Sequence, residues 1–406
     1  MKRFFLTLTI LLTITYQLKA QWNLINASQP SYNLYAVDFV NATTGWIVGE
    51  YGFIFKTTDG GLSWQTQVSG TINNLLSVSA VDENNCWISG RFGTILHTSD
   101  GGTNWVTQPS GEMEYFAGIN FSDLNNGWIT GTNGFILNTT NGGQNWILDT
   151  TITSNNVYSV HFINHATGWI AGYGGTILKT TDSGMSWVTT TTSGNDYLRS
   201  IFFADQLNGW AAGYGGLILK TTDGGASWNY QNSTTPHDFY SIHFPDQNNG
   251  WAVGSIGNIF NSNDGGINWS SQISGTMFKL KSVDFVDQNI GWAVGDSGTI
   301  LSTTNGGITS VICYGETPTE YLLEQNFPNP FNPGTKISWQ APVSGWQTLK
   351  IFNSLGQEVE TIVNEYLEAG VHSKLYIINS TLPSGVYFYS LQVNNFRDTK
   401  KMILLR

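Results

Sequence analysis

The chain has 406 residues, of which 11% are charged and 14% aromatic, and it contains 46 glycines. Few charges combined with many aromatic and turn-forming residues favour an exported all-β protein of two or three domains. The formal net charge is −11, and residues 21–316 alone hold seven Lys or Arg against 21 Asp or Glu. An acidic body of this kind argues against nucleic acid and anionic lipid as partners.

The first 20 residues predict a signal peptide. Lys2 and Arg3 form a basic start, residues 4–14 are mostly apolar, and Ala20 suits the position before the cut. The apolar run is shorter than the ~20 residues that a membrane-spanning helix needs. We therefore expect residues 1–20 to be removed and no later segment to cross a membrane. A retained membrane anchor is the alternative.

A unit of 41 residues, typified by GWAAGYGGLILKTTDGGASW at residues 209–228, occurs seven times without an insertion. A fixed period of this length indicates stacked or radially arranged units that cannot bury a core alone. Each unit contains four short β runs, which in the first copy are residues 34–40, 45–49, 52–56 and 63–67. Four strands in each of seven units predict an all-β fold, a seven-bladed β-propeller over residues 21–315. The first tryptophans of the successive copies are Trp46, Trp87, Trp128, Trp169, Trp210, Trp251 and Trp292.

The columns of the repeat follow the strand period of two. Seven and nine residues before each tryptophan the residues are apolar in every copy, as at Phe39 and Val37, and we expect them to share one buried face. The residue ten positions before the tryptophan is small in every copy, as close packing near a central axis requires. Asp or Asn five positions before the tryptophan predicts a turn.

A second turn, Thr221–Trp228, has the sequence TTDGGASW and resembles the Asp-box of sialidase-type and related propellers. Its aspartate is expected to cap the turn, its glycines to permit positive φ, and its tryptophan to pack between strands. The chemistry and the resemblance both imply a structural role for these residues. The equivalent positions are Asp59, Asp100, Asn141, Asp182, Asp223, Asp264 and Asn305.

The two ends of the repeat array are complementary. The seventh copy lacks its last tryptophan, whereas Trp22 lies in a run, residues 21–25, that looks like the missing outer strand. Trp22 precedes Trp46 by 24 residues, and Trp64 precedes Trp87 by 23. We therefore expect the N-terminal strand to complete the seventh blade, because this pairing removes exposed sheet edges. Deletion of residues 21–28 is expected to open the ring.

The chain has two cysteines, Cys86 in the second repeat and Cys313 after the last. In a ring they belong to units two apart, so we expect free or buried thiols and no disulfide. Eight residues before the tryptophan, the innermost strand carries Asp38, His161, His243 and Asp284. A water-filled channel explains these residues more simply than a metal site, and we expect neither metal nor cofactor.

The pattern changes after Gly315. Residues 316–321 form a short linker, and residues 322–406 contain QNFPNPFNPGTKISWQAP, LKIFNSLGQEVETIV and LPSGVYFYSLQV in that order. These motifs resemble the type A C-terminal sorting domain of the type IX secretion system, and their alternating apolar runs predict a small antiparallel β-sandwich. The resemblance implies passage across the outer membrane by the type IX machinery, then release or surface attachment. A generic adhesive or carbohydrate-binding domain is the alternative.

Known hydrolytic arrangements find little support in the sequence. There is no G-x-S-x-G nucleophile motif, no phosphate loop and no zinc-binding spacing. The sialidase family clamps its substrate with three arginines, whereas the propeller region has only Arg91 and Arg199. Xyloglucanase-type glycosidases pair two such propellers, and one is present here. Photosystem II assembly-factor propellers have a similar repeat, which supports the fold. We therefore expect a binding protein rather than an enzyme.

The hairpin between the second and third strands varies most among the copies, and variable positions are free for function. In propellers it shares a face with the connections between blades, where an aromatic rim and a charged arc would suit an extracellular polysaccharide or a surface protein. The aromatic residues of the connections are Tyr115, Phe116, Tyr197, Phe239 and Phe278. The candidate binding residues are Glu50, Tyr51, Arg91, Phe92, Tyr173, Tyr214 and Asp296.

Three alternatives stay open. Asp296 and Glu50 are candidates for the carboxylate pair of a glycoside hydrolase, which requires a separation of ~5–10 Å. The protein is alternatively a structural component of the cell surface or of adhesion. In the third alternative, the loop face holds only solvated loops with packing aromatics. We expect a monomer.

Overall fold

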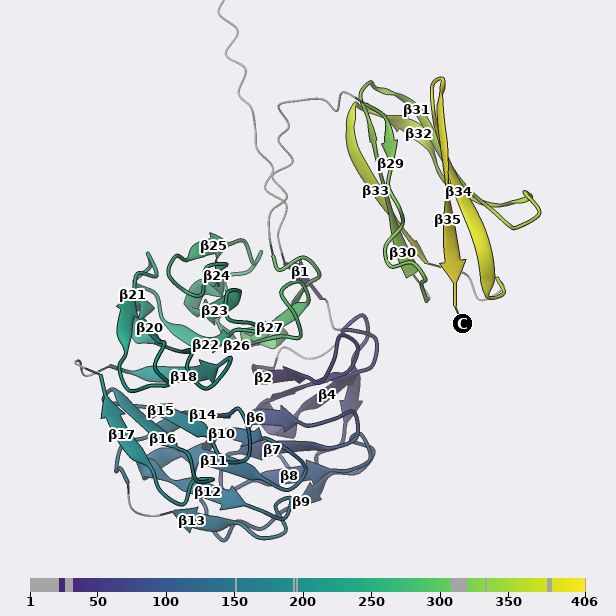
Figure 1. Cartoon of the computed structure of the whole chain (residues 1–406). Coiled ribbons are helices and arrows are strands. Elements are labelled where there is room, and N and C mark those ends of the chain that lie inside the picture. The colour runs from purple at the N-terminus through teal and green to yellow at the C-terminus, as the bar shows by residue number, and fades with distance from the viewer. Residues whose placement is uncertain are drawn as a thin grey trace, which may run out of the picture. The chain divides into compact units, whose positions relative to one another are not determined.

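The computed structural model describes residues 22–25, 32–149, 152–192, 194, 196–307, 320–332, 334–377 and 382–405. The predicted signal peptide, Cys313 and residues 316–319 of the predicted linker lie outside the described residues. The described chain divides into two compact units, one built from the repeats and one from the C-terminal strands (Figure 1).

Seven antiparallel four-stranded sheets are arranged around a common centre and form the seven-bladed propeller that the repeat predicts (Figure 1). The first strand of each blade contacts the first strands of both neighbouring blades, and the ring closes between β26 and β2. Blades 1 and 2 comprise β2 (Leu34–Phe39), β3 (Gly45–Gly49), β4 (Ile54–Thr57) and β5 (Gln65–Gln67), then β6 (Leu75–Ala80), β7 (Cys86–Gly90), β8 (Ile95–Thr98) and β9 (Val106–Thr107). Blades 3 and 4 comprise β10 (Phe116–Phe121), β11 (Gly127–Gly131), β12 (Ile136–Thr139) and β13 (Ile147–Asp149), then β14 (Val157–Phe162), β15 (Gly168–Gly172), β16 (Thr176–Thr180) and β17 (Val188–Thr191).

The remaining blades follow the same order. Blades 5 and 6 comprise β18 (Leu198–Phe203), β19 (Gly209–Gly213), β20 (Ile218–Thr221) and β21 (Asn229–Gln231), then β22 (Phe239–His243), β23 (Gly250–Gly254), β24 (Ile259–Ser262) and β25 (Ser270–Gln272). Blade 7 comprises β26 (Leu280–Phe285), β27 (Gly291–Gly295), β28 (Ile300–Thr303) and β1 (Asn23–Leu24). Five of the hairpins contain a short 3₁₀ turn: η1 (Glu50–Gly52), η2 (Thr132–Gly134), η3 (Tyr214–Gly216), η4 (Ser255–Gly257) and η5 (Asp296–Gly298).

In blade 1 the third and fourth strands begin two residues later than the sequence predicts. Residues 50–52 form the turn η1 before β4, and Ser63 belongs to the Asp-box turn that precedes β5. The Ser63 N–H and hydroxyl donate to the Asp59 carboxylate at 2.9 and 2.6 Å. These bonds hold Ser63 in the turn, so the strand starts beyond it.

The N-terminal strand completes blade 7, as the position of Trp22 predicts. β1 pairs antiparallel with β28, with Asn23 opposite Ser302 and Leu24 opposite Leu301. The Trp22 side chain is 1% exposed, meets Phe285 edge-on, and donates its indole N–H to Gln272 at 2.9 Å. The ring is therefore closed by a sheet that contains both ends of the repeat array.

Each framework tryptophan packs against the blade that follows it. The Trp210 ring stacks on Phe244 of the next blade, with 3.6 Å between the ring centroids, and its indole N–H donates to the carbonyl of Gly265 at 2.9 Å. Between blade 7 and blade 1, the Trp292 indole N–H donates in the same way to the Gly60 carbonyl at 3.0 Å. Equivalent indole bonds join Trp87 to Gly142, Trp128 to Ser183, Trp169 to Gly224 and Trp251 to Gly306. Six of the seven blade interfaces thus share one design.

The interface between blades 1 and 2 departs from this design for a steric reason. A side chain at Gly45 would overlap the ring of Phe39, and the same relation holds between Gly209 and Phe203. In blade 2 the phenylalanine position is Ala80, and its cross-strand partner is Cys86. The smaller Ala80 leaves room for the thiol, which is buried and unpaired. Trp46 consequently lacks a phenylalanine to stack on, and its indole nitrogen has no hydrogen-bond partner among the described residues.

The small residue ten positions before the tryptophan has a second role besides packing. The Ser159 hydroxyl accepts the backbone N–H of Ile201 in the next blade at 3.1 Å, and Ser282 of blade 7 accepts that of Val37 in blade 1 at 3.3 Å. Serine hydroxyls therefore join the first strands of adjacent blades at five of the seven blade pairs. The same contact occurs at Ser77, Ser200 and Ser241.

The Asp-box turns are closed by hydrogen bonds to the aspartate. In blade 5 the Asp223 carboxylate accepts the Ser227 hydroxyl at 2.6 Å, the Ser227 N–H at 2.9 Å and the Thr221 hydroxyl at 2.7 Å. These bonds lower the pKa of Asp223 to about 2. Gly224 and Gly225 have φ of 73 and 88°, the left-handed region that favours glycine.

The C-terminal unit is a small antiparallel β-sandwich. One sheet has the order β29-β30-β33 and the other has the order β32-β31-β34-β35. The core between them includes Trp339, Leu349, Tyr389 and Leu404. The strands are β29 (Leu322–Leu323), β30 (Gly334–Ala341), β31 (Gly345–Phe352), β32 (Glu358–Leu367), β33 (Gly370–Ile377), β34 (Gly385–Val393) and β35 (Phe396–Leu404).

Candidate functional site

The loop face of the propeller is built from braced hairpins. The middle hairpin residue has positive φ, 56° at both Tyr51 and Phe92, and these side chains are 63% and 60% exposed. Left-handed backbone costs energy in residues other than glycine. A hydrogen bond from the Tyr51 N–H to the Asn74 side chain at 3.2 Å offsets this cost. The Ser297 N–H donates in the same way to Asn33 at 3.0 Å. Asn133 and Gly215 make the same contact, so four of the hairpins are fastened to the connection that leads to the next blade.

Glu50 and Asp296 lie on adjacent blades and share one cation. The Lys281 ammonium is 2.5 Å from the Asp296 carboxylate and 4.2 Å from the centre of the Tyr35 ring. The Glu50 carboxylate accepts the Asn33 side-chain amide at 2.9 Å, the Asn33 N–H at 3.1 Å and the Tyr35 hydroxyl at 3.1 Å. Burial acts to raise the pKa of Glu50, but these hydrogen bonds and Lys281 together lower it.

Arg91 stands apart from this network. Its guanidinium carbon lies 5.3 Å from the centre of the Tyr115 ring, and it forms no ion pair within the part of the chain that the structure describes. Within the expected charged arc of Glu50, Arg91 and Asp296, the arginine therefore forms an ion pair with neither carboxylate. Two carboxylates share Lys281, and the arginine packs on an aromatic ring.

The candidate residues Tyr173 and Tyr214 are brought together by Tyr197. The Tyr197 ring stacks on Tyr214 with 4.4 Å between the ring centroids and meets Tyr173 edge-on at 5.3 Å. Its hydroxyl lies 2.6 Å from that of Tyr158, and Tyr240 packs against Tyr214 at 5.9 Å. These five residues, from blades 4, 5 and 6, form what we call the tyrosine cluster.

A single arginine lies within the tyrosine cluster. The Arg199 guanidinium carbon is 4.5 Å from the centre of the Tyr158 ring, and its buried Nε has no hydrogen-bond partner among the described residues. Tyr173 and Tyr214 remain 41% and 38% exposed. Burial raises the pKa of Tyr158 and of Tyr214, so both hydroxyls stay protonated at neutral pH and can donate. The cluster therefore offers exposed rings, hydroxyl groups and one cation.

Three members of this site were missing from the sequence candidates: Tyr158, Arg199 and Tyr240. They occupy the position eleven residues before the tryptophan of their repeat. At this position the first strand of the blade has a β-bulge, so the residue has no partner on the second strand. A bulge re-aims the side chain of the extra residue. This column also varies between copies, so the comparison that singled out the hairpins would have found it. Its members are Tyr35, Leu76, Ala117, Tyr158, Arg199, Tyr240 and Lys281.

Two residues expected on the aromatic rim were placed there wrongly. Phe116 and Phe239 are fully buried, whereas Phe278 is 51% exposed. The buried pair stand twelve residues before the tryptophan, a column that is apolar in every copy. This column belongs to the core of each blade, so its uniformity was the signal that these rings are framework.

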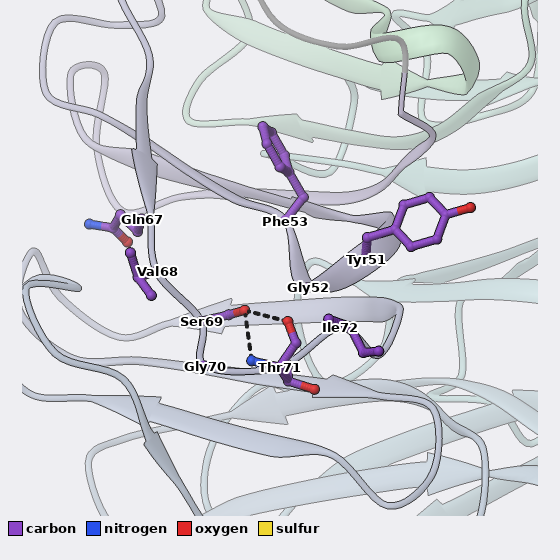
Figure 2. A pocket seen from close by; sticks show the side chains of 9 residues that line it. All are labelled: Tyr51, Gly52, Phe53, Gln67, Val68, Ser69, Gly70, Thr71 and Ile72. Carbon is purple, nitrogen blue, oxygen red and sulfur yellow. Dashed lines mark hydrogen bonds between the residues drawn. The ribbon is translucent and has the colours of Figure 1, made fainter.

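Figure 2 shows a groove of about 610 Å³ at blade 1, between the turn η1 and the connection that leaves β5. Tyr51, Val68 and Ile72 line it and are 63%, 87% and 83% exposed. The Ser69 hydroxyl holds the connection in shape, because it donates to the Thr71 carbonyl and accepts the Thr71 N–H. The groove combines these exposed apolar side chains with polar ones, among them Gln67 and Ser69, and is separate from the tyrosine cluster.

The polar residues of the innermost strands bind backbone groups of the next blade. The Asp38 carboxylate accepts the Ala80 N–H at 2.6 Å, and Asp284 accepts the Phe39 N–H at 2.7 Å. His243 Nδ1 accepts the Phe285 N–H at 2.9 Å, and burial lowers its pKa to about 3. No group of three or more His, Cys, Asp or Glu suited to a metal ion occurs in the described ranges.

Replacing Asp38 by Asn is expected to stabilise the protein at alkaline pH. Burial raises the pKa of Asp38 to about 6, so the folded state disfavours the carboxylate, and stability falls as the pH rises from about 4 through 6. Asn120 accepts the equivalent N–H in blade 3 at 2.9 Å, so Asp38→Asn keeps the hydrogen bond. Thermal melts at pH 4 and pH 8 should show a variant advantage only at pH 8, of about 1–3 kcal/mol. An advantage that does not change with pH would contradict this reading.

The closed ring, the Asp-box turns and the braced loop face define an Asp-box β-propeller joined to a C-terminal β-sandwich. The chain belongs to the family described as photosynthesis system II assembly factor YCF48, whose model matches residues 14–111, 107–190, 148–234 and 226–311. The secretion system C-terminal sorting domain matches residues 325–405. The sorting domain shows that the protein is secreted through the type IX secretion system to the cell surface, and that its C-terminal domain interacts with that machinery.

Solved structures share the fold at low sequence identity. YCF48 from Cyanidioschyzon merolae is 22% identical over 70% of this chain and 99% of its own, with a TM-score of 0.59. YCF48 bound to D1 peptide is 19% identical over 71% of this chain and 96% of its own, with a TM-score of 0.61. PorZ, a surface component of the type IX secretion system of Porphyromonas gingivalis, is 12% identical over 91% of this chain and 59% of its own, with a TM-score of 0.51.

No curated protein matches the chain. In the described part of the chain there is no helix with the length and apolar character needed to span a bilayer.

Proposed function

We propose that the propeller is a non-enzymatic binding module of the cell surface that holds an extracellular polysaccharide at its loop face. The tyrosine cluster carries this proposal. Sugars present an apolar ring face bordered by hydroxyls, and exposed tyrosines match both features with their rings and phenol groups. Arg199 adds a positive charge beside the Tyr158 ring. Export to the surface brings such a site into contact with extracellular glycans.

The carboxylates of the loop face support binding better than hydrolysis. A glycosidase needs a general acid whose pKa is raised, whereas the pKa of Glu50 is lowered by Asn33, Tyr35 and Lys281. Asp296 is occupied by the Lys281 ammonium. A GH74 enzyme of Niastella koreensis has a similar fold at 12% identity, over 79% of this chain and 59% of its own, with a TM-score of 0.58. That likeness concerns the fold alone.

A surface protein is the second candidate ligand, and the groove beside Tyr51 favours it. Val68 and Ile72 are among the most exposed apolar side chains of the propeller, and exposed apolar groups that gather in one place are typical of protein contacts. A related propeller has been solved with a bound peptide. This candidate uses blade 1 instead of blades 4 to 6, so the two are separable by mutation.

Binding to a glycan array is expected to fall by roughly tenfold or more in the double variant Tyr173→Ala/Tyr214→Ala, because each exposed ring supplies stacking area. The mature full-length chain is the reference, and Tyr51→Ala is the matched control, since it removes a hairpin tyrosine from another blade. Loss of binding in the control alone would move the ligand to the groove. Glycan binding that survives in both variants would refute the tyrosine cluster as the site.

A further inference from the structure

The outer face of the sheet β32-β31-β34-β35 is unusual for the solvent side of a sandwich. Along β31 the residues Leu349 and Ile351 point into the core, so Trp346, Thr348, Lys350 and Phe352 lie on the opposite face. A solvated face of an antiparallel sheet is normally polar. This one carries large aromatic residues among short polar ones.

Two of these aromatic residues form a pair at one end of the sheet. Trp346 and Tyr366 face each other across β31 and β32, and they are 58% and 60% exposed. The Trp346 indole N–H donates to Asn364 on β32 at 2.7 Å. This bond points the indole edge towards the neighbouring strand and fixes the ring in place. The pair is an open aromatic surface that the sandwich core does not use, and its Trp346 ring is held by a hydrogen bond.

A furrow runs from Trp346 along the same face, and Tyr366 lies beside its Trp346 end without lining it. Its first hollow, of about 440 Å³, is lined by Trp346, Thr348, Lys350 and Gln392 among others. A second hollow, of about 240 Å³, shares Thr348, Lys350 and Gln392 with the first and adds Arg397. A third, of about 300 Å³, continues past Arg397 to the Phe352 end of β31. At ~3.3 Å per residue the furrow follows β31 for about 20 Å, which is the length of several sugar rings.

The groups along the furrow suit hydroxyl-rich ligands. Thr348, Asn364 and Gln392 supply amide and hydroxyl groups, and Arg397 is bonded to the neutral Ser390 hydroxyl at 3.2 Å. The two central strands β31 and β34 are paired on both sides, so a peptide cannot add to their backbone as an extra strand along the middle of the furrow. Recognition on this face must therefore use side chains, with aromatic rings at one end and polar groups along the middle.

From the paired exposed aromatics and the continuous polar furrow, we infer that the C-terminal sandwich carries a glycan-binding site for a linear polysaccharide chain, centred on Trp346 and Tyr366. The sugar ring stacks on the Trp346 indole, and its hydroxyls meet Asn364, Gln392 and Arg397. This site lies in a different unit from the tyrosine cluster and does not depend on it. The domain would then hold a surface polysaccharide in addition to its part in secretion.

An array of linear neutral and acidic oligosaccharides, probed with the mature full-length chain, tests this site. Trp346→Ala and Tyr366→Ala are each expected to weaken a common set of array signals by roughly tenfold or more. Val371→Ala, an exposed apolar change on the other sheet, should leave them unchanged. Because both aromatic side chains are more than half exposed, the variants should keep the wild-type melting temperature.

The propeller variant Tyr173→Ala/Tyr214→Ala separates this site from the one proposed on the loop face. Signals that depend on Trp346 should persist in that variant, and signals that depend on the tyrosine cluster should persist in Trp346→Ala. If every array signal is insensitive to both Trp346→Ala and Tyr366→Ala, the sandwich has no such site. The result for the tyrosine cluster would stand unaffected.

Discussion

A chain that begins at residue 26, and so lacks β1, is expected to melt roughly 10 °C or more below the mature protein. Loss of a buried tryptophan such as Trp22 alone costs about 3–5 kcal/mol, and in a domain of this size each kcal/mol lowers the melting temperature by about 2–4 °C. The deletion also exposes the edge of β28, which pairs with β1 through Asn23 and Leu24. Thermal unfolding followed by circular dichroism measures the effect.

The point variant Trp22→Ala separates packing from strand pairing. It removes the ring that meets Phe285 and the bond to Gln272, while the backbone of β1 can still pair. We expect a melting temperature between those of the deletion and the wild type. The exposed Leu24→Ala is the control, because its side chain is 52% exposed and should contribute little. A deletion that melts like the wild type would show that β1 does not close the ring.

Replacing Trp210 by Phe is expected to destabilise the protein by about 2–4 kcal/mol. The variant leaves the buried Gly265 carbonyl without its indole donor, which costs about 1–3 kcal/mol, and it creates a small cavity beside Phe244. Chemical denaturation measures the change.

Trp46→Phe is the matched control for this variant. Trp46 is as deeply buried as Trp210, but its indole nitrogen has no partner among the described residues. The control therefore removes ring volume without breaking a hydrogen bond. It also removes a buried indole N–H that has no acceptor among the described residues. We expect it to cost at least about 1 kcal/mol less than Trp210→Phe. Equal losses would show that the bond to the next blade contributes nothing.

The fold could be predicted because its determinants are repeated. The spacing of the repeated tryptophans predicted the number of blades, and the position of Trp22 predicted that the N-terminal strand completes blade 7. The strand pairing confirms both predictions. The single irregular interface could not be predicted from either residue alone. Cys86 is tolerated in place of glycine only because Ala80 opposes it, and this pairing becomes visible when the register is known.

The candidate site was predicted less completely, for a geometric reason. Tyr173 and Tyr214 lie on the variable hairpins and were found, but Tyr158, Arg199 and Tyr240 lie on innermost strands, where alternation alone gives no sign of a bulge. A second cation beside the expected charged arc of Glu50, Arg91 and Asp296 was also missed. Lys281, three residues after the exposed connection residue Phe278, forms an ion pair with Asp296 and lowers the pKa of Glu50, and it was not among the sequence candidates.

The closure of blade 7 makes completion of the fold depend on completion of the chain. β1 is made first, yet its partner β28 lies almost the whole propeller away, with Asn23 opposite Ser302. Contacts of such long sequence separation form late, because the intervening loop must be ordered first. A truncated product that stops before residue 300 retains an unpaired N-terminal strand and an open sheet edge. A complete propeller therefore differs in structure from a truncated one. The sorting domain is synthesised only after β28, the partner of β1, has been made.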